Sequence, residues 1–322
     1  MTHDSTMKRL SGKLGFLKGK GVLFAVIVLC VFLSICSPNF LTVGNLMIVL
    51  RQSSYIMIIA FGMTMVIGMG DIDLSVSAIA ALSGIIAAKM LVAGSSTFLS
   101  CVTALAFGFT LGFFNGFLIS VLGMTAFIAT LGTMSICRGV AMLITRGIPI
   151  FGLQFPSFQF LSQGFISIVP FPVVLSIVML ACAAFLIKKT ALGRYILSIG
   201  SNVEAARLVG INIKYVRVLV FSICGLLSAL AGLLLTSRLE AASPVAGDGY
   251  EMDVIAATVI GGTSLVGGKA KMSGTFIGAL VMGIVRNGLT LLSINVFWHR
   301  VVLGAIILIS VEIDILSQRK KD

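Results

Sequence analysis

The sequence predicts an all-α membrane protein, a polytopic bundle of about ten transmembrane helices. Hydrophobic residues make up 58% of the 322 residues, charged residues only 11%, and the mean hydropathy is +1.13. Soluble domains contain roughly 45–50% apolar residues. A closed β-barrel, the other structure that can span a bilayer, needs alternating apolar and polar residues, whereas segments 22–34 and 172–187 are almost continuously apolar.

Apolar stretches long enough to cross a bilayer define the predicted spans, since crossing about 30 Å of hydrocarbon takes about 20 helical residues. The second span carries Arg51 and Gln52 in its first turns, and the eighth is short, as a broken transporter helix would be. The ten predicted spans cover residues 21–37, 46–68, 74–93, 98–119, 124–145, 168–187, 216–237, 253–268, 272–292 and 297–316.

The basic residues gather at both ends of the chain and in one interior loop, 188–215. With an even number of spans the termini share one side, and the positive-inside rule makes that side the cytoplasm. We therefore predict a multi-pass protein of the bacterial inner membrane. Its parts are a basic cytoplasmic N-terminus (1–20), a single transmembrane domain (21–317) and a cytoplasmic tail (318–322). Loops 38–45, 146–167 and 238–252 are predicted outside, and 188–215 and 269–271 inside.

Several function classes are excluded by composition and motifs. The net charge of +12 would suit nucleic acid, but the basic residues have the distribution of cytoplasmic loops. The six cysteines lie in apolar runs, and His3 and His299 are far apart, so no metal site is predicted. No HExxH or GxSxG motif is present, which argues against an intramembrane enzyme.

A faint internal similarity suggests two halves. Segment 72–84 (IDLSVSAIAALSG) is similar to 252–264 (MDVIAATVIGGTS), and Asn115-Gly116 is echoed by Asn287-Gly288. Two transmembrane halves descended from one unit would explain both similarities.

The interior loop predicts a short helix over residues 202–209. Ser201 and Glu204 have the spacing of a capping box, and Gly210 stands where a left-handed C-cap would end the helix. Two turns of helix are marginal alone in water. The helix is therefore either a surface linker between two spans or a docking element for a partner.

Strings along nearly the whole chain resemble the ribose-type permeases of ABC sugar importers. They are SPNFLTVGNL (37–46), GDIDLSVSAIAALSG (70–84), AFIATLGTMSICRG (126–139), LGRYILSIGSNVEAARLVGIN (192–212), GLLSALAGLLLTSRL (225–239) and GYEMDVIAATVIGGTSLVGGK (249–269). The sequence departs from the family at Asp71 and Ser77, where glycine is usual, and at Arg286, where a neutral residue is usual.

The resemblance implies a permease that passes a small sugar, without enzymatic activity of its own. The implied partners are a cytoplasmic ATPase subunit that binds ATP and Mg, a periplasmic sugar-binding protein, and a second permease copy in a homodimer or paired heterodimer. The interior helix would be the coupling helix that faces the ATPase. Its residues are Asn202, Glu204, Ala205, Ala206, Arg207, Leu208 and Gly210.

The energy source must lie outside the chain or in an ion gradient. GGTSLVGGK (261–269) is not a phosphate-binding loop, because Thr263 replaces the first glycine and Ala270 follows the lysine. No cofactor is therefore expected on this chain. The acidic residues fall near predicted span ends or in loops, which favours an ATP-driven importer over an ion-coupled secondary transporter of a small polar solute, the alternative.

A path for a neutral sugar needs hydroxyl and amide groups, which also serve to hold helices together. The candidates are Asn115, Asn287, Thr64, Thr130, Thr133 and Ser135. The outer loops would receive the binding protein through charged residues. These are Arg146, Arg238, Glu240, Asp248 and Glu251. Asp71, Asp73 and Arg286 are either structural or functional, and the sequence leaves both roles open.

Overall fold

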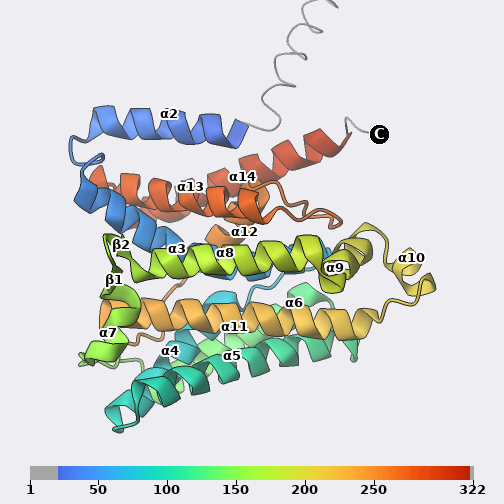
Figure 1. The fold of residues 1–322 in the computed structure, drawn as a ribbon, viewed down its shortest axis with the longest axis horizontal. Coiled ribbons are helices and arrows are strands. Elements are labelled where there is room, and N and C mark those ends of the chain that lie inside the picture. Colours follow the sequence, from blue (N-terminus) through green and yellow to red (C-terminus); the bar gives the residue numbers. More distant parts are fainter. Residues whose placement is uncertain (1–20, 320–322) are drawn as a thin grey trace, which may run out of the picture.

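The computed structural model describes residues 21–319. The predicted cytoplasmic N-terminus, 1–20, and residues 320–322 of the predicted tail, 318–322, lie outside this range. The chain forms a bundle of helices that run along one direction (Figure 1). Its elements are α2 (Gly21–Cys36), α3 (Val43–Gly68), α4 (Val76–Val92), α5 (Thr97–Ser120), α6 (Ala126–Thr145), α7 (Pro156–Gln163), β1 (Phe165–Ile166), β2 (Val169–Pro170), α8 (Phe171–Lys189), α9 (Ala191–Ser201), α10 (Val203–Leu208), α11 (Ile213–Leu239), α12 (Tyr250–Ile260), α13 (Met272–Leu291) and α14 (Val296–Arg319).

The predicted membrane helical bundle is confirmed, and each predicted span contains a helix. Within residues 21–319, six helices are long and apolar enough to cross a membrane, namely α3, α5, α6, α8, α11 and α13. Shorter apolar helices cover Val26–Cys36, Val76–Val92 and Phe297–Ile306. The count of ten spans therefore stays a prediction.

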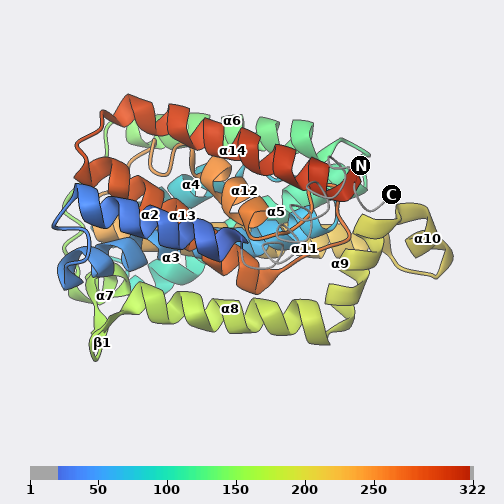
Figure 2. The ribbon, with the colours of Figure 1, turned by 90° about the horizontal axis from the view of Figure 1, so that it is seen from above.

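Helices α3 and α11 form the centre of the bundle. Every residue of α3 from Ser53 to Gly68 is buried, and α11 packs against α3, α4 and α5. The approach of α5 to α11 is backbone to backbone, since a Cβ at Gly112 would lie 2.2 Å from the carbonyl oxygen of Phe221. Small residues allow such close approach between membrane helices. At the edges of the bundle, α6 and α14 lie along one side and α8 along the other (Figure 2).

The bundle has two different ends. Helices α9 and α10 lie at one end, and α7 with the two-stranded hairpin β1-β2 lies at the other (Figure 1). The loops predicted inside and outside, 188–215 and 146–167, are thus at opposite ends. The helix α7 inside the predicted outer loop was not expected from the sequence.

The eighth predicted span, 253–268, is wrong in its extent. Helix α12 has 11 residues and ends at Ile260, and residues 261–271 continue as a loop. Gly262, Gly267 and Gly268 adopt φ values of 86°, 94° and 74°, a left-handed conformation that is favourable only for glycine and that a helix cannot continue through. The span is therefore a half-length helix followed by a glycine-rich loop.

The predicted capping box at the interior helix is wrong. Ser201 is the last residue of α9, and its hydroxyl donates to the carbonyl oxygen of Leu197 at 2.9 Å. Asn202 is the N-cap of α10 instead, and its side-chain oxygen accepts from the Ala205 amide at 2.9 Å. The predicted C-cap is confirmed, since Gly210 has a φ of 82°.

Candidate functional site

Helix α10 presents a small apolar tip at one end of the molecule. Leu208 and Val209 are 88% and 76% exposed, whereas Ala206 is buried against the rest of the chain. Glu204 and Arg207 form an exposed ion pair of 3.2 Å on the same helix. Large exposed apolar side chains on so short a helix are typical of a surface that a partner covers. All the predicted coupling residues lie on α10, at its cap or in the turn after it.

Glycines from three separate segments meet next to α9 and α10. Gly200, near the end of α9, packs against Gly68 at the end of α3 and against the loop after α12. A Cβ at Gly200 would lie 2.0 Å from the Gly68 oxygen and 2.5 Å from the Gly268 nitrogen. The Gly268 amide donates to the Gly68 carbonyl oxygen at 3.0 Å. We call this contact of residues 68, 200, 267 and 268 the glycine junction. It joins α9 directly to α3 and to the loop that precedes α13.

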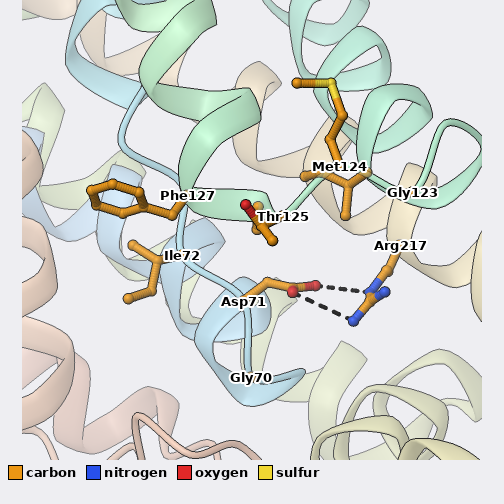
Figure 3. A pocket seen from close by; sticks show the side chains of 10 residues that line it. Gly70, Asp71, Ile72, Gly123, Met124, Thr125, Phe127 and Arg217 are labelled. Carbon is orange, nitrogen blue, oxygen red and sulfur yellow. Dashed lines mark hydrogen bonds and ion pairs between the residues drawn. The ribbon is translucent and has the colours of Figure 1, made fainter.

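An ion pair crosses the inner pocket, a cavity of about 470 Å³ between the 69–75 and 121–125 loops and α11. Asp71 and Arg217 face each other there (Figure 3). Arg217 Nε lies 2.9 Å from Asp71 Oδ2, and Nη2 lies 3.4 Å from Oδ1. Arg217 lies in the second turn of α11, close in sequence to α10. The pair therefore links the start of α11 to the loop between α3 and α4.

Most of the predicted path residues hold helices together. The Asn115 side-chain amide donates to Ser75 Oγ at 2.8 Å, and Asn287 and Asn45 exchange hydrogen bonds of 2.8 and 3.0 Å. Thr64 lies 2.7 Å from the hydroxyl of Thr275. All of these side chains are buried, so in this conformation they bridge helices rather than line an open path.

Helix α6 carries the remaining path candidates. Thr130 and Thr133 are buried, and the Thr130 hydroxyl donates to the Ala126 carbonyl oxygen at 2.8 Å. Ser135 is exposed, as are Gly132 and Gly139, and a Cβ at either glycine would meet nothing within 4 Å. This face of α6 is therefore uncovered within the chain.

The predicted docking residues lie at the opposite end from α10, and they differ in exposure and in their hydrogen-bond and ion-pair partners. The carboxylate of Glu240 accepts from Gln163, Gln159 and Gln154 at 2.9, 2.8 and 3.5 Å, and these hydrogen bonds, that of Gln163 first, lower the pKa of Glu240 below its ordinary value. Glu240 thus ties α7 to the end of α11.

The other charges of this end differ in exposure. Arg146 is exposed and ends α6 in a left-handed conformation. Asp248 is exposed and pairs with Arg300 at 2.6 Å, whereas Glu251 is buried. Arg146, Asp248 and Glu240 are therefore the residues that a partner at this end could reach.

A second polar cavity, here called the outer pocket, lies inside the chain toward this end. Its volume is about 150 Å³. Arg238, predicted as a docking residue, and Arg286 both line it, and Arg286 forms an ion pair with the fully buried Asp253. The full lining is Gln52, Ile56, Arg238, Tyr250, Gly283, Arg286, Thr290 and His299. Four of these residues, Gln52, Arg286, Thr290 and His299, are polar residues within predicted spans, but the sequence did not indicate that they meet.

Asp73 has a local role. It is fully buried, and its Oδ1 accepts from the Ser75 amide and hydroxyl at 2.9 and 2.6 Å. The carboxylate thus caps the turn that leads into α4. No group of three or more metal-ligating acidic, histidine or cysteine side chains occurs within the part of the chain that the structure describes.

Comparison with known proteins gives the family. Residues 45–311 match the family model described as the permease component of the branched-chain amino acid transport system. The chain is 42% identical to the ribose import permease of Haemophilus influenzae over 300 residues, 92% of this chain and 93% of that protein. It is 43% identical to the ribose import permease of Bacillus subtilis over 301 residues, 93% and 94% of the two chains.

A further relative is the D-allose transport system permease of Escherichia coli, 38% identical over 294 residues, 91% of this chain and 90% of that protein. No solved structure matches the chain. The family model and these relatives cover nearly the whole length of the sequence, and the chain therefore belongs to this family of membrane transport permease components.

Proposed function

We propose that the chain is the permease subunit of an ABC importer that passes a small sugar delivered by a periplasmic binding protein. The observation that carries this proposal is the identity of more than 40% to ribose import permeases over nearly the full length. Two features support ATP-driven coupling rather than the ion-coupled alternative. The exposed apolar tip of α10 offers a contact surface for a partner subunit, and the glycine junction connects α9, next to α10, to the central helix α3.

The coupling proposal follows the contacts inward from α10. A cytoplasmic ATPase covers Leu208 and Val209, so that burial of this apolar surface stabilises the complex. ATP and Mg bind on that subunit. Movement of α10 then displaces α9, and the glycine junction and the Asp71–Arg217 pair pass the displacement to α3 and α11. Alternating access follows from such a rigid-body shift of packed helices.

A second permease copy would complete the path. The uncovered side of α6 offers Gly132, Ser135 and Gly139 for close contact with another helix. On α14, which lies along the same side of the bundle (Figure 2), Phe297, Trp298 and Val301 are exposed. We place the contact between copies on this side, with the sugar passing between them.

The proposed orientation of the permease in the membrane rests on the difference between the two ends of the bundle. The end with α9 and α10 faces the cytoplasm of a bacterium, with both termini on that side, and the end with α7 faces the binding protein. Arg146, Glu240 and Asp248 would orient the binding protein by complementary charge.

The two halves are proposed to be an inverted repeat. Helix α4 runs toward the α7 end, because Ala80 lies beside Gly232 and Gly84 beside Thr236 of α11, whereas α12 runs toward the α9 end, because Gly261, which follows it, lies beside Gly274 at the start of α13. The similar strings 72–84 and 252–264 thus run in opposite directions, as inverted transporter repeats do.

Reconstitution tests the function. Permease assembled in proteoliposomes with its ATPase and binding protein is expected to accumulate ribose only when ATP is present on the ATPase side. Leu208→Asp should release the ATPase from tagged permease and lower uptake at least about tenfold, because it places a charge in an apolar contact. Ile168→Asp, at a 77% exposed residue of the opposite end, should retain the ATPase. Uptake by the permease alone, driven by a proton gradient, would instead establish the ion-coupled alternative.

The Asp71–Arg217 pair gives a second test. Asp71→Asn is expected to lower ATP-driven ribose uptake several-fold, since it leaves a half-buried guanidinium without its carboxylate at the inner pocket. The exchange Asp71→Arg with Arg217→Asp should recover part of the uptake. Rates of uptake at equal permease content are the measurement, and equal rates for all three proteins would show that the pair has no part in transport.

A further inference from the structure

Two guanidinium groups, which carry donors and no acceptor, line the outer pocket beside side chains that can both donate and accept hydrogen bonds. Within the described part of the chain, Arg238 makes no hydrogen bond and no ion pair, and the Arg286 Nε and His299 Nε2 atoms are buried without an acceptor. Each guanidinium carries several N–H donors and no acceptor. The buried, unpaired nitrogens of Arg286 and His299 are costly unless a group that hydrogen-bonds to them occupies the pocket, and the Arg238 donors face it without a partner.

The charges of the pocket are unbalanced. Two arginines line it, and the carboxylate that pairs with either of them is Asp253, which contacts Arg286. Among residues 21–319, no carboxylate lies within ion-pair distance of Arg238. In a cavity walled by apolar helices, a net positive charge favours an anion much more strongly than it would in water.

Aromatic rings hold the two guanidinium groups at the pocket. The guanidinium carbon of Arg286 lies 5.0 Å from the ring centroid of Tyr250, and that of Arg238 lies 5.8 Å from the ring of Tyr55. Such cation–π contacts position the side chains without using their N–H donors. The donors therefore remain available to a ligand in a cavity of about 150 Å³, which admits one small solute.

We propose that the outer pocket binds a small polyhydroxy solute that bears one carboxylate, a sugar acid. Arg238 and Arg286 take the carboxylate, since planar guanidinium groups match carboxylate geometry. Gln52, Thr290 and His299 supply hydrogen bonds to hydroxyl groups. The proposal rests on the proposed function for the setting of the pocket and goes beyond it, since the pocket binds a sugar acid in addition to the neutral sugar that the importer passes. The names of the relatives specify neutral sugars.

A fluorescence titration of the permease alone tests the pocket. Trp298 is the single tryptophan of the chain and precedes His299 of the pocket. In nanodiscs of phosphatidylcholine, D-gluconate is expected to change its emission saturably and to bind at least about tenfold more tightly than D-glucose, because only gluconate pairs with the guanidinium groups. Inorganic phosphate at the same concentrations is the comparison for an anion without hydroxyl groups.

Substitutions at Arg238 test whether gluconate binds in the outer pocket. Arg238→Gln is expected to weaken gluconate binding at least about tenfold. Arg238→Lys keeps the positive charge but lacks the paired N–H donors of a planar guanidinium group, and it should bind gluconate with intermediate strength. Arg194→Gln removes an exposed arginine of α9 that does not line the pocket, and it should bind gluconate as the parent does.

Four results would overturn the proposal. These are no saturable response to gluconate, equal binding of glucose, equal binding of phosphate, and loss of the response when phosphatidylglycerol replaces part of the lipid, which would assign the pocket to an anionic headgroup. The titration needs neither ATP nor the ATPase. Its failure therefore leaves ATP-driven ribose uptake untouched, and failure of that uptake leaves the binding result standing.

Discussion

Gly200→Ala is expected to abolish ATP-driven uptake while the permease still holds its ATPase. The added methyl group would lie 2.0 Å from the Gly68 oxygen and 2.5 Å from the Gly268 nitrogen. Both neighbours are backbone atoms, so α9 has to move away from α3 and from the loop after α12. Overpacking of this kind typically costs about 1–3 kcal/mol, and it separates the surfaces through which α10 acts on the bundle.

Uptake and ATPase retention distinguish this result from simple misfolding. Leu208 and Val209 are exposed at the end of α10, outside the glycine junction, and should still bind the ATPase. Uptake should fall at least about tenfold. Gly44→Ala is the matched control, because its Cβ would meet nothing within 4 Å in the first turn of α3, and alanine favours a helix over glycine by about 1 kcal/mol. Normal uptake by Gly200→Ala would show that the junction tolerates separation and transmits no movement.

Long apolar helices could be predicted from the sequence, whereas the elements that give the ends their shape could not. A continuous apolar run identifies a span without reference to the rest of the chain. Helix α9 was predicted only as part of the interior loop 188–215, because no continuous apolar run marks it as a span. Its buried residues, Ile196 and Ile199, become recognisable only once α3 is seen beside them.

The polar sites required tertiary structure. Gln52, Arg238 and Arg286 come from three helices that are far apart in sequence. Gln52 and Arg286 were polar residues within predicted spans, and Arg238 was assigned to the outer loop 238–252, but their convergence depends on the packing of α13 and α11 against α3. The asparagines illustrate the converse. Asn115 and Asn287 have side chains suited to a sugar path, yet their amide groups already donate hydrogen bonds to Ser75 and Asn45.

Asp253→Asn is expected to destabilise the permease strongly. Asp253 is fully buried at the start of α12, and its ion pair with Arg286 fixes α12 to α13. Removing one partner of a buried pair leaves an uncompensated charge and costs about 3–5 kcal/mol. The unfolding midpoint of purified permease should fall by several degrees. Asp248→Asn breaks an ion pair whose side chains are 54% and 78% exposed, and such pairs contribute about 0–1 kcal/mol. Its midpoint should therefore stay within a degree or two of the parent.

The double variant Asp253→Leu with Arg286→Met separates stability from binding. Replacing both charges by apolar side chains of similar size removes the cost of burying them, so the midpoint should return toward that of the parent. The outer pocket would then retain Arg238 but lose Arg286, and gluconate binding should stay weak although the protein is stable again. A double variant as unstable as Asp253→Asn would mean that hydrogen bonds at this position, rather than charge compensation, hold α12 and α13 together.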